Sequence, residues 1–479
     1  MRFIRQIDSH LVAAVLVVFT LFFAVFDSLR KTMFREAAWN YQYPDWALIY
    51  NPFAIVLLLL LVSLLMYNYG KISTLEDRHF ILVLVFCTVG FSALAFFITP
   101  IKSTKWALTP DVQGPVETFQ YYPSTIAAEE GLKTFFSTFH SAPTLNGGDR
   151  IETTQYLTEQ LRNTTYLPWN NFLADYTSNI ITQRHGPIPA LLVAPFLIIL
   201  GTSPTSAVLG SYALTLSLPI ISYGIFRQYF PEQQARLGTI LVLISPAYLI
   251  YQRYGTVSYD AITAVITAVA VLIFLRACRT ENQPLLVLSG VVFSGAMLSK
   301  ISILTMCPTF AIIIFIYSNT IQESMKSGII FGLSSLIIPF ALLLVGYNFV
   351  AQYLYDIARI QMSGGGSSGL FGRFVAIYNV RYLGIVVLGF ALSFVLSVGS
   401  NLPNIPASKR DQVAIGFIPA ILPFGLFSGI TLSRHLLPLL PLLVFIALCG
   451  IDRYSSCQLN QREIAAIVIS TIILGIVNF

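Results

Sequence analysis

The chain is 479 residues long; 56% of its residues are hydrophobic, only 10% are Asp, Glu, Lys or Arg, and its formal net charge is +6. Soluble domains carry about 25% charged residues, so this composition excludes an ordinary soluble protein. Charge-free stretches such as 53–66 and 329–345 are typical of membrane segments, because the hydrocarbon core takes roughly 20 apolar residues to cross. The net positive charge suits a membrane protein and does not indicate a nucleic-acid partner.

The apolar runs predict an all-α, multi-pass fold with about 13 transmembrane helices. No small-residue cleavage site follows the first apolar run, so we interpret it as a span that the mature protein keeps. We expect residues 1–78 to hold an N-terminal accessory hairpin, 79–450 the transmembrane core, and 451–479 a loop and the last span. The expected spans lie near residues 10–28, 51–68, 79–99, 205–226, 237–251, 260–276, 283–299, 301–317, 328–349, 379–399, 412–432, 435–450 and 463–479.

A long polar loop, residues 100–186, separates the third span from the rest of the core. A connection of this length is uncommon without structure of its own, and the amphipathic pattern around 126–136 predicts short interfacial helices in it. The apolar stretch 188–200 that follows is short and contains Pro189 and Pro195. It fits an interfacial or re-entrant segment better than a full span.

The distribution of basic residues favours one orientation. With the N-terminus in the cytoplasm and 188–200 not crossing, 13 Lys and Arg residues fall inside, 9 in short outer loops and 6 in the long outer loop. This agrees with the positive-inside rule, although Arg30, Lys31 and Arg35 then lie outside. Several ionisable residues remain outside near helix ends, where charges are costly and indicate a site. They are Asp111, Glu117, His185, Arg253, Asp260, Lys300, Arg434 and His435. The alternative for each is an interfacial anchor whose charge reaches water.

Cofactor motifs are scarce. The five cysteines are scattered in or beside apolar runs, without metal-ligand spacing. No Walker loop or dinucleotide fingerprint occurs, which disfavours a nucleotide-sugar or ATP site and favours a lipid-linked donor. No cluster of three carboxylates demands a divalent metal, so we name no cofactor and leave a metal open.

Four patches carry a resemblance to a known family. They are "RYGTVSYDAITAVITAVAVLIFLRA", "GAMLSKISILTMCP", "RHGPIPALLVAPFLIILG" and "SRHLLPLLPLL". Together they resemble the protein O-mannosyltransferase and aminoarabinose-transferase family of GT-C membrane glycosyltransferases, in that family's order. In this resemblance Asp260 matches the family's carboxylate at the beginning of a span. Ser299 and Lys300 match the turn of a later helix pair, and Pro308 matches the proline that follows this turn.

The resemblance implies transfer of a sugar from a polyprenyl-phosphate carrier to an acceptor hydroxyl on the outer face, with inversion if no covalent sugar intermediate forms. The family's outer loop begins with an acidic pair, usually Asp-Glu, whose aspartate is the presumed base. In "GPVETFQYYPST" Glu117 matches the glutamate, but Val116 replaces the aspartate. Glu117 or, in another register, Asp111 would then be the catalytic base.

The remaining candidates would bind the donor. Lys300, Arg434 and Arg253 are the expected phosphate ligands, and His185 or His435 would hydrogen-bond phosphate or sugar. Tyr121 and Tyr122, beside Glu117, are further substrate-binding candidates, and Asp260 would orient the cations or bind the sugar. The plain alternatives are an exposed helix N-cap for Asp260 and a kink at the interface for Lys300.

Rival functions stay open at this point. A transporter or lipid flippase would explain many spans, but it predicts internal repeats, and none is clear. A polysaccharide polymerase, which is also polytopic, and a purely structural membrane subunit are two more rivals. We expect a bacterial or archaeal plasma-membrane protein whose partners are the bilayer, a polyprenyl-phosphate sugar and an acceptor that is a protein, lipid or glycan.

Overall fold

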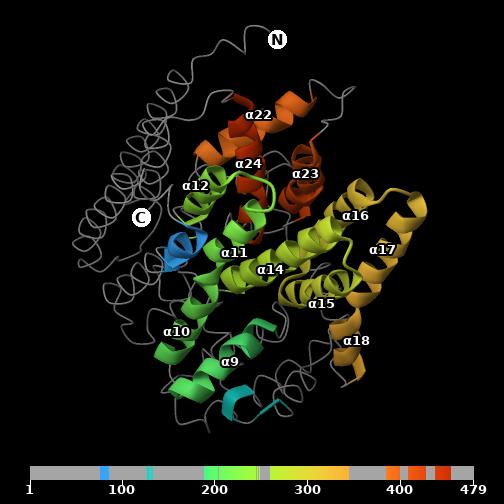
Figure 1. The fold of residues 1–479 in the computed structure, drawn as a ribbon. Coiled ribbons are helices and arrows are strands. Elements are labelled where there is room, and N and C mark those ends of the chain that lie inside the picture. The colour runs from blue at the N-terminus through green and yellow to red at the C-terminus, as the bar shows by residue number, and fades with distance from the viewer. Residues whose placement is uncertain are drawn as a thin grey trace, which may run out of the picture.

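The computed structural model describes residues 76–82, 84–85, 127–129, 131–132, 188–202, 204–243, 245, 248, 259–344, 385–399, 408–427 and 437–454. The secondary structure in these residues is helical, without strands, which confirms the all-α prediction. The helices, labelled as in Figure 1, are α9 (Ile188–Leu200), α10 (Pro204–Thr215), α11 (Ser217–Phe226), α12 (Glu232–Leu243), α14 (Tyr259–Thr280), α15 (Gln283–Ser299), the 3₁₀ helix η3 (Ile301–Met306), α16 (Cys307–Tyr317), α17 (Ile321–Ser334), α18 (Ile337–Leu344), α22 (Ile385–Gly399), α23 (Lys409–Phe427) and α24 (Leu440–Tyr454).

Among the described residues, three helical segments are long and apolar enough to cross a membrane, by length and composition: Leu209–Phe226, Asp260–Thr280 and Ile321–Leu344. Shorter apolar helices cover Ile188–Leu200, Gln283–Ser299, Ser302–Tyr317 and Val387–Gly399. These segments confirm the membrane character, while the expected total of 13 spans stays a prediction, as does the division at residues 78 and 450.

Helix α9 forms the short segment expected at 188–200. Its 13 residues measure about 20 Å at 1.5 Å per residue, which is less than the roughly 30 Å core of a bilayer. Gly201, at φ +83°, ends α9, and α10 then packs beside it (Figure 1). A Cβ at Gly210 of α10 would lie 2.8 Å from the Phe196 side chain, so glycine permits this close approach.

The hairpin of α14 and α15 positions the residues of interest. Asn282 caps α15 by accepting a hydrogen bond from the Leu285 N–H (3.0 Å), and Glu281 makes the turn with φ 50°. Because the two helices are antiparallel neighbours, the beginning of α14 and the end of α15 lie together. We call this the Asp260 end and the opposite end of the hairpin the Arg279 end.

Polar contacts gather further helix termini at the Arg279 end. Arg279 Nη1 donates to the Gln228 carbonyl (2.5 Å) between α11 and α12, and Lys409 Nζ donates to the Ile316 carbonyl (2.5 Å) near the end of α16. Asp452 of α24 accepts from Gln234 of α12 (2.8 Å). The ends of α11, α14, α16 and α24 therefore meet the beginnings of α12, α15 and α23 in this region.

Two ion-pair networks reinforce the same end. In one, the fully buried Arg236 and the half-exposed Arg227 pair with Glu232 and Asp77. In the other, Arg410 binds Asp452 (2.6 Å) and Arg453 binds Asp411 (3.1 Å), which joins the beginning of α23 to the end of α24. The networks neutralise charges that would be costly at membrane depth.

An aromatic core holds α14 to α17 together between the two ends. Phe274, Phe293, Phe310 and Phe331 come from four different helices, with ring centroids 4.6–5.7 Å apart. Such tilted and edge-on pairs add to the free energy gained from burial. Helix α17 is nevertheless largely exposed: only 22% of the most apolar 18-residue stretch of Ile321–Leu344 is buried, against 67% of the corresponding stretch of Asp260–Thr280. Helices α17 and α18 follow one another along one edge of the described part (Figure 1).

Helix α17 begins at Ile321, seven residues before the predicted span at 328. The Thr320 hydroxyl accepts from the Glu323 N–H (3.1 Å), and the Glu323 carboxylate accepts from the Asn319 N–H (3.0 Å). Thr-x-x-Glu is a capping-box pattern, so a polar first turn precedes the apolar segment. Hydrophobic runs alone do not reveal such a turn.

Candidate functional site

Asp260 and Lys300 form an ion pair at the Asp260 end. Asp260 is the second residue of α14, where the helix dipole favours a carboxylate. Lys300 follows α15 in an extended conformation, with φ −154° and ψ 119°. Its backbone N–H donates to Ala296 (3.0 Å), and its carbonyl accepts from Ile303 (3.1 Å), so the turn between α15 and η3 holds the lysine opposite Asp260.

The pair is largely withdrawn from solvent: the side chains of Lys300 and Asp260 are 15% and 11% exposed. An isolated charge in such surroundings is costly, and an opposite charge in hydrogen-bond contact offsets much of that cost. The contact brings together two residues that the sequence interpretation assigned to donor binding, while the role of Asp260, to orient the cations or to bind the sugar, stays a prediction. A simple N-cap does not account for the contact of the carboxylate with Lys300.

Unpartnered hydroxyl groups lie on the first turns of α14. Thr263 and Thr267 follow Asp260 by three and seven residues, on the same side of the helix, and both are fully buried. Within the described residues their Oγ1 atoms have no hydrogen-bond partner, and neither does Ser302 Oγ, two residues after Lys300. The nearby Ser299 hydroxyl, in contrast, donates to the Gly295 carbonyl (2.8 Å). Buried hydroxyl groups therefore follow each member of the pair in the chain, on α14 after Asp260 and on η3 after Lys300.

This arrangement can bind an anion. An ammonium group has three donors, so a lysine can contact a carboxylate and a phosphate oxygen together. A carboxylate beside it fixes the position of the ammonium group and limits the net charge when no anion is bound. The Asp260 carboxylate is engaged by Lys300, so we expect the catalytic base to come from elsewhere in the chain.

The other predicted site residues lie outside the described residues: Glu117, Asp111, Arg434, His435, Arg253, His185, Tyr121 and Tyr122. Their roles stay predictions. Helices α23 and α24 lie on either side of residues 428–436 in the chain. Asp411, near the beginning of α23, pairs with Arg453, near the end of α24, at the Arg279 end. Phe427 and Leu437 are therefore at the far termini of these antiparallel helices.

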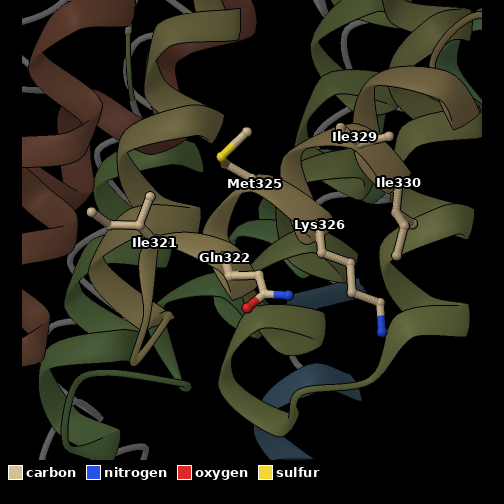
Figure 2. Close-up of a pocket in the computed structure, with 6 residues that line it drawn as sticks. All are labelled: Ile321, Gln322, Met325, Lys326, Ile329 and Ile330. Carbon is tan, nitrogen blue, oxygen red and sulfur yellow. The ribbon is translucent and has the colours of Figure 1, made fainter.

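No cluster of three or more His, Cys, Asp or Glu side chains that could hold a metal ion occurs in the part of the chain that the structure describes. A surface hollow lies elsewhere, on α17, lined by Ile321, Gln322, Met325, Lys326, Ile329 and Ile330 (Figure 2). Because the labelled residues all belong to one exposed helix and only two are polar, the hollow does not present the converging polar groups of a catalytic site.

Residues 184–345 match the profile of the family described as dolichyl-phosphate-mannose-protein mannosyltransferase. This segment contains both Asp260 and Lys300, and the match confirms the resemblance inferred from the sequence. No curated protein matches the chain.

A solved structure also matches: the Archaeoglobus fulgidus oligosaccharyltransferase in the apo form, at 14% sequence identity and a TM-score of 0.45. The match covers 76% of this chain and 55% of that one, so the chain spans about half the length of that protein.

Proposed function

We propose that this chain, whose residues 184–345 resemble the dolichyl-phosphate-mannose-protein mannosyltransferases, is a membrane glycosyltransferase. It moves a sugar from a polyprenyl-phosphate carrier to an acceptor hydroxyl at the membrane face that contains the Asp260 end. The observation that carries the proposal is the Asp260–Lys300 ion pair inside the matched segment. The pair supplies a positioned cation for the leaving phosphate.

The division of roles follows from the chemistry. Sugar transfer needs a base for the acceptor hydroxyl and a positive group for the charge that develops on the phosphate. Lys300 binds that phosphate, and Asp260 holds Lys300 in place. Glu117, or Asp111 in the other register, is the base, and Arg434, Arg253, His185, His435, Tyr121 and Tyr122 complete the donor and acceptor sites.

The charge distribution supports an outer active face. Of the ten Lys and Arg residues in the described part, Lys300 is the one at the Asp260 end, and the other nine lie toward the Arg279 end. The positive-inside rule places the more basic end in the cytoplasm. In a variant without native cysteines, Glu281→Cys at the Arg279 end should react with an impermeant maleimide only after the cells are opened. Labelling in intact cells would show that the Arg279 end faces outward, which is the opposite of the proposed orientation.

A transfer assay tests the activity. Purified protein in detergent with lipid is offered a panel of polyprenyl-phosphate sugars, and release of polyprenyl phosphate is followed. We expect release with one donor, its loss in Lys300→Gln and in one of Glu117→Gln and Asp111→Asn, and full activity in the matched control Lys326→Gln. No release with any donor, while these lipids still cross a bilayer with the protein present, would replace the transferase by a transporter.

A further inference from the structure

Four polar side chains from separate segments meet at the Arg279 end, away from the proposed site. The hydroxyl groups of Tyr229 and Tyr317 lie 2.7 Å apart. Lys409 Nζ lies 5.3 Å from the centre of the Tyr317 ring, and Arg279 donates to the carbonyl of Gln228, the residue directly before Tyr229. We call these four residues the Arg279–Lys409 cluster.

The two cations of this cluster differ from four arginines at the same end. Arg227, Arg236, Arg410 and Arg453 each pair with a carboxylate. Arg279 and Lys409 instead donate to backbone carbonyls, those of Gln228 and Ile316, and among the described residues no carboxylate lies within ion-pair distance of either. Both are exposed. A guanidinium has five N–H donors and an ammonium three, so each cation retains donors for an anionic ligand.

The position of the cluster indicates which anion it meets. Arg279 lies one residue before the end of a candidate membrane span, and the end of a helix that crosses the bilayer reaches the lipid headgroups. Tyrosine is enriched at this depth because its ring is apolar and its hydroxyl polar. Phe315 and Ile321, on either side of Tyr317 in the chain, are 63% and 72% exposed, and they offer acyl chains an apolar surface.

We propose that Arg279 and Lys409 bind the phosphate of an anionic phospholipid in the leaflet next to the Arg279 end. Arginine binds phosphate oxygens as a fork and lysine as a point charge, and the tyrosine hydroxyl that donates to no neighbour supplies a further hydrogen bond. Bound lipid joins the end of α14 to the beginning of α23 and stabilises the packing of these helices. The inference does not depend on the proposed transferase activity.

The test measures thermal unfolding of the purified full-length protein in detergent, titrated with phosphatidylglycerol or with phosphatidylcholine of the same acyl chains. We expect phosphatidylglycerol to raise the melting temperature saturably and phosphatidylcholine to have little effect. Arg279→Gln and Lys409→Gln should each weaken the response about fivefold, which corresponds to the roughly 1 kcal/mol of one basic residue near an anionic surface. Arg279→Lys and Lys409→Arg keep the charge and should keep most of the response.

The matched control is Arg78→Gln, which also removes one exposed arginine at this end, where it pairs with Glu76. An equal loss in Arg78→Gln would mean diffuse attraction and would overturn the site. An equal response to phosphatidylcholine, whose headgroup has a phosphate but no net charge, would overturn the selectivity for an anionic lipid. Full competition by inorganic phosphate would show that the cluster binds a free anion and not a lipid. No response to phosphatidylglycerol in the unmodified protein would also overturn the proposal.

Discussion

The Lys300 ammonium group contacts the Asp260 carboxylate across 40 residues of chain and thereby joins the end of α15 to the beginning of α14. Two largely buried charges that compensate each other fix the geometry of a helix–helix turn without leaving a net charge. The same contact presents a positioned cation at one end of the bundle. A structural role and a phosphate-binding role therefore make different predictions for the two residues.

The first prediction separates these roles. Asp260→Asn or Lys300→Gln should each lower the free energy of unfolding by about 1–3 kcal/mol, because the remaining buried charge loses its partner. The double variant should regain part of this stability. Transfer activity should fall about 100-fold or more in Lys300→Gln, the typical cost of one donor that stabilises developing negative charge, and should not recover in the double variant. Thermal unfolding in detergent and release of polyprenyl phosphate are the two measurements.

Glu76→Gln is the matched control for stability, because it removes the carboxylate of the exposed pair with Arg78, whose side chains are 65% and 74% exposed. Exposed pairs contribute about 0–1 kcal/mol, so this change should have little effect. If the double variant of Asp260 and Lys300 keeps normal transfer activity, the pair has a purely structural role.

Local patterns in the sequence account for the helices and for part of the site. Apolar runs near 260–276 and 283–299 correspond to α14 and α15, and the alternation of spans places Asp260 and Lys300 at the same end. Their contact then follows from the short connection, since the structure brings the two helices together as antiparallel neighbours.

Other features depend on which helices become neighbours, and periodicity does not contain this information. Arg410 and Arg453 count toward the inside charge in the sequence, yet each pairs with a carboxylate 42 residues away. The cluster of Arg279 and Lys409 is likewise invisible, because its cations contact backbone carbonyls that any residue provides. The polar first turn of α17 could be found from its capping box at Thr320.

The second prediction concerns the packing of α15 on α17. A Cβ at Gly290 would lie 2.8 Å from the Phe331 carbonyl oxygen and closer still to the Ser334 hydroxyl. Gly290→Ala should therefore lower the free energy of unfolding by about 1–3 kcal/mol, because the backbone of α17 must move. At Gly328 of α17 the same Cβ meets nothing within 4 Å, and Gly328→Ala should be neutral or stabilise by up to about 1 kcal/mol. Equal effects in thermal unfolding would contradict this packing.

The third prediction concerns Asp452, which accepts from Arg410 (2.6 Å) and Gln234 (2.8 Å). Asp452→Asn should lower the free energy of unfolding by about 1–3 kcal/mol, since a charge-assisted hydrogen bond is lost. Arg410→Gln should give a similar loss, and the double variant less than the sum of the two, with a coupling of about 0.5–3 kcal/mol. Strict additivity in a double-mutant cycle would show that the two side chains do not interact. Glu281→Gln, in the exposed turn before α15, removes a carboxylate without a partner among the described residues and is the control.

The fourth prediction is a pH dependence that originates at Tyr229. This residue lies in the connection between α11 and α12, and burial raises the pKa of its hydroxyl well above the ordinary 10.0, with a further contribution from Tyr317. In the unfolded chain the phenol ionises near pH 10, whereas in the folded chain it stays protonated. The unfolded state therefore binds fewer protons above pH 10, and the stability that the buried phenol provides is full below pH 10 and is lost as the pH rises further.

Comparison of the protein with Tyr229→Phe isolates this effect from the other tyrosines. At pH 7.5 the variant should be less stable by about 0.5–1.5 kcal/mol, because the hydrogen bond to Tyr317 is lost. Above pH 10 the difference should shrink, by up to about 1.4 kcal/mol per pH unit, because phenylalanine has no proton to lose in the unfolded state. Thermal unfolding at pH 7.5, 9, 10 and 11 measures the difference directly. A difference that stays constant over this range would mean that the Tyr229 hydroxyl ionises as readily in the folded protein as in the unfolded chain, which its burial and its contact with Tyr317 oppose.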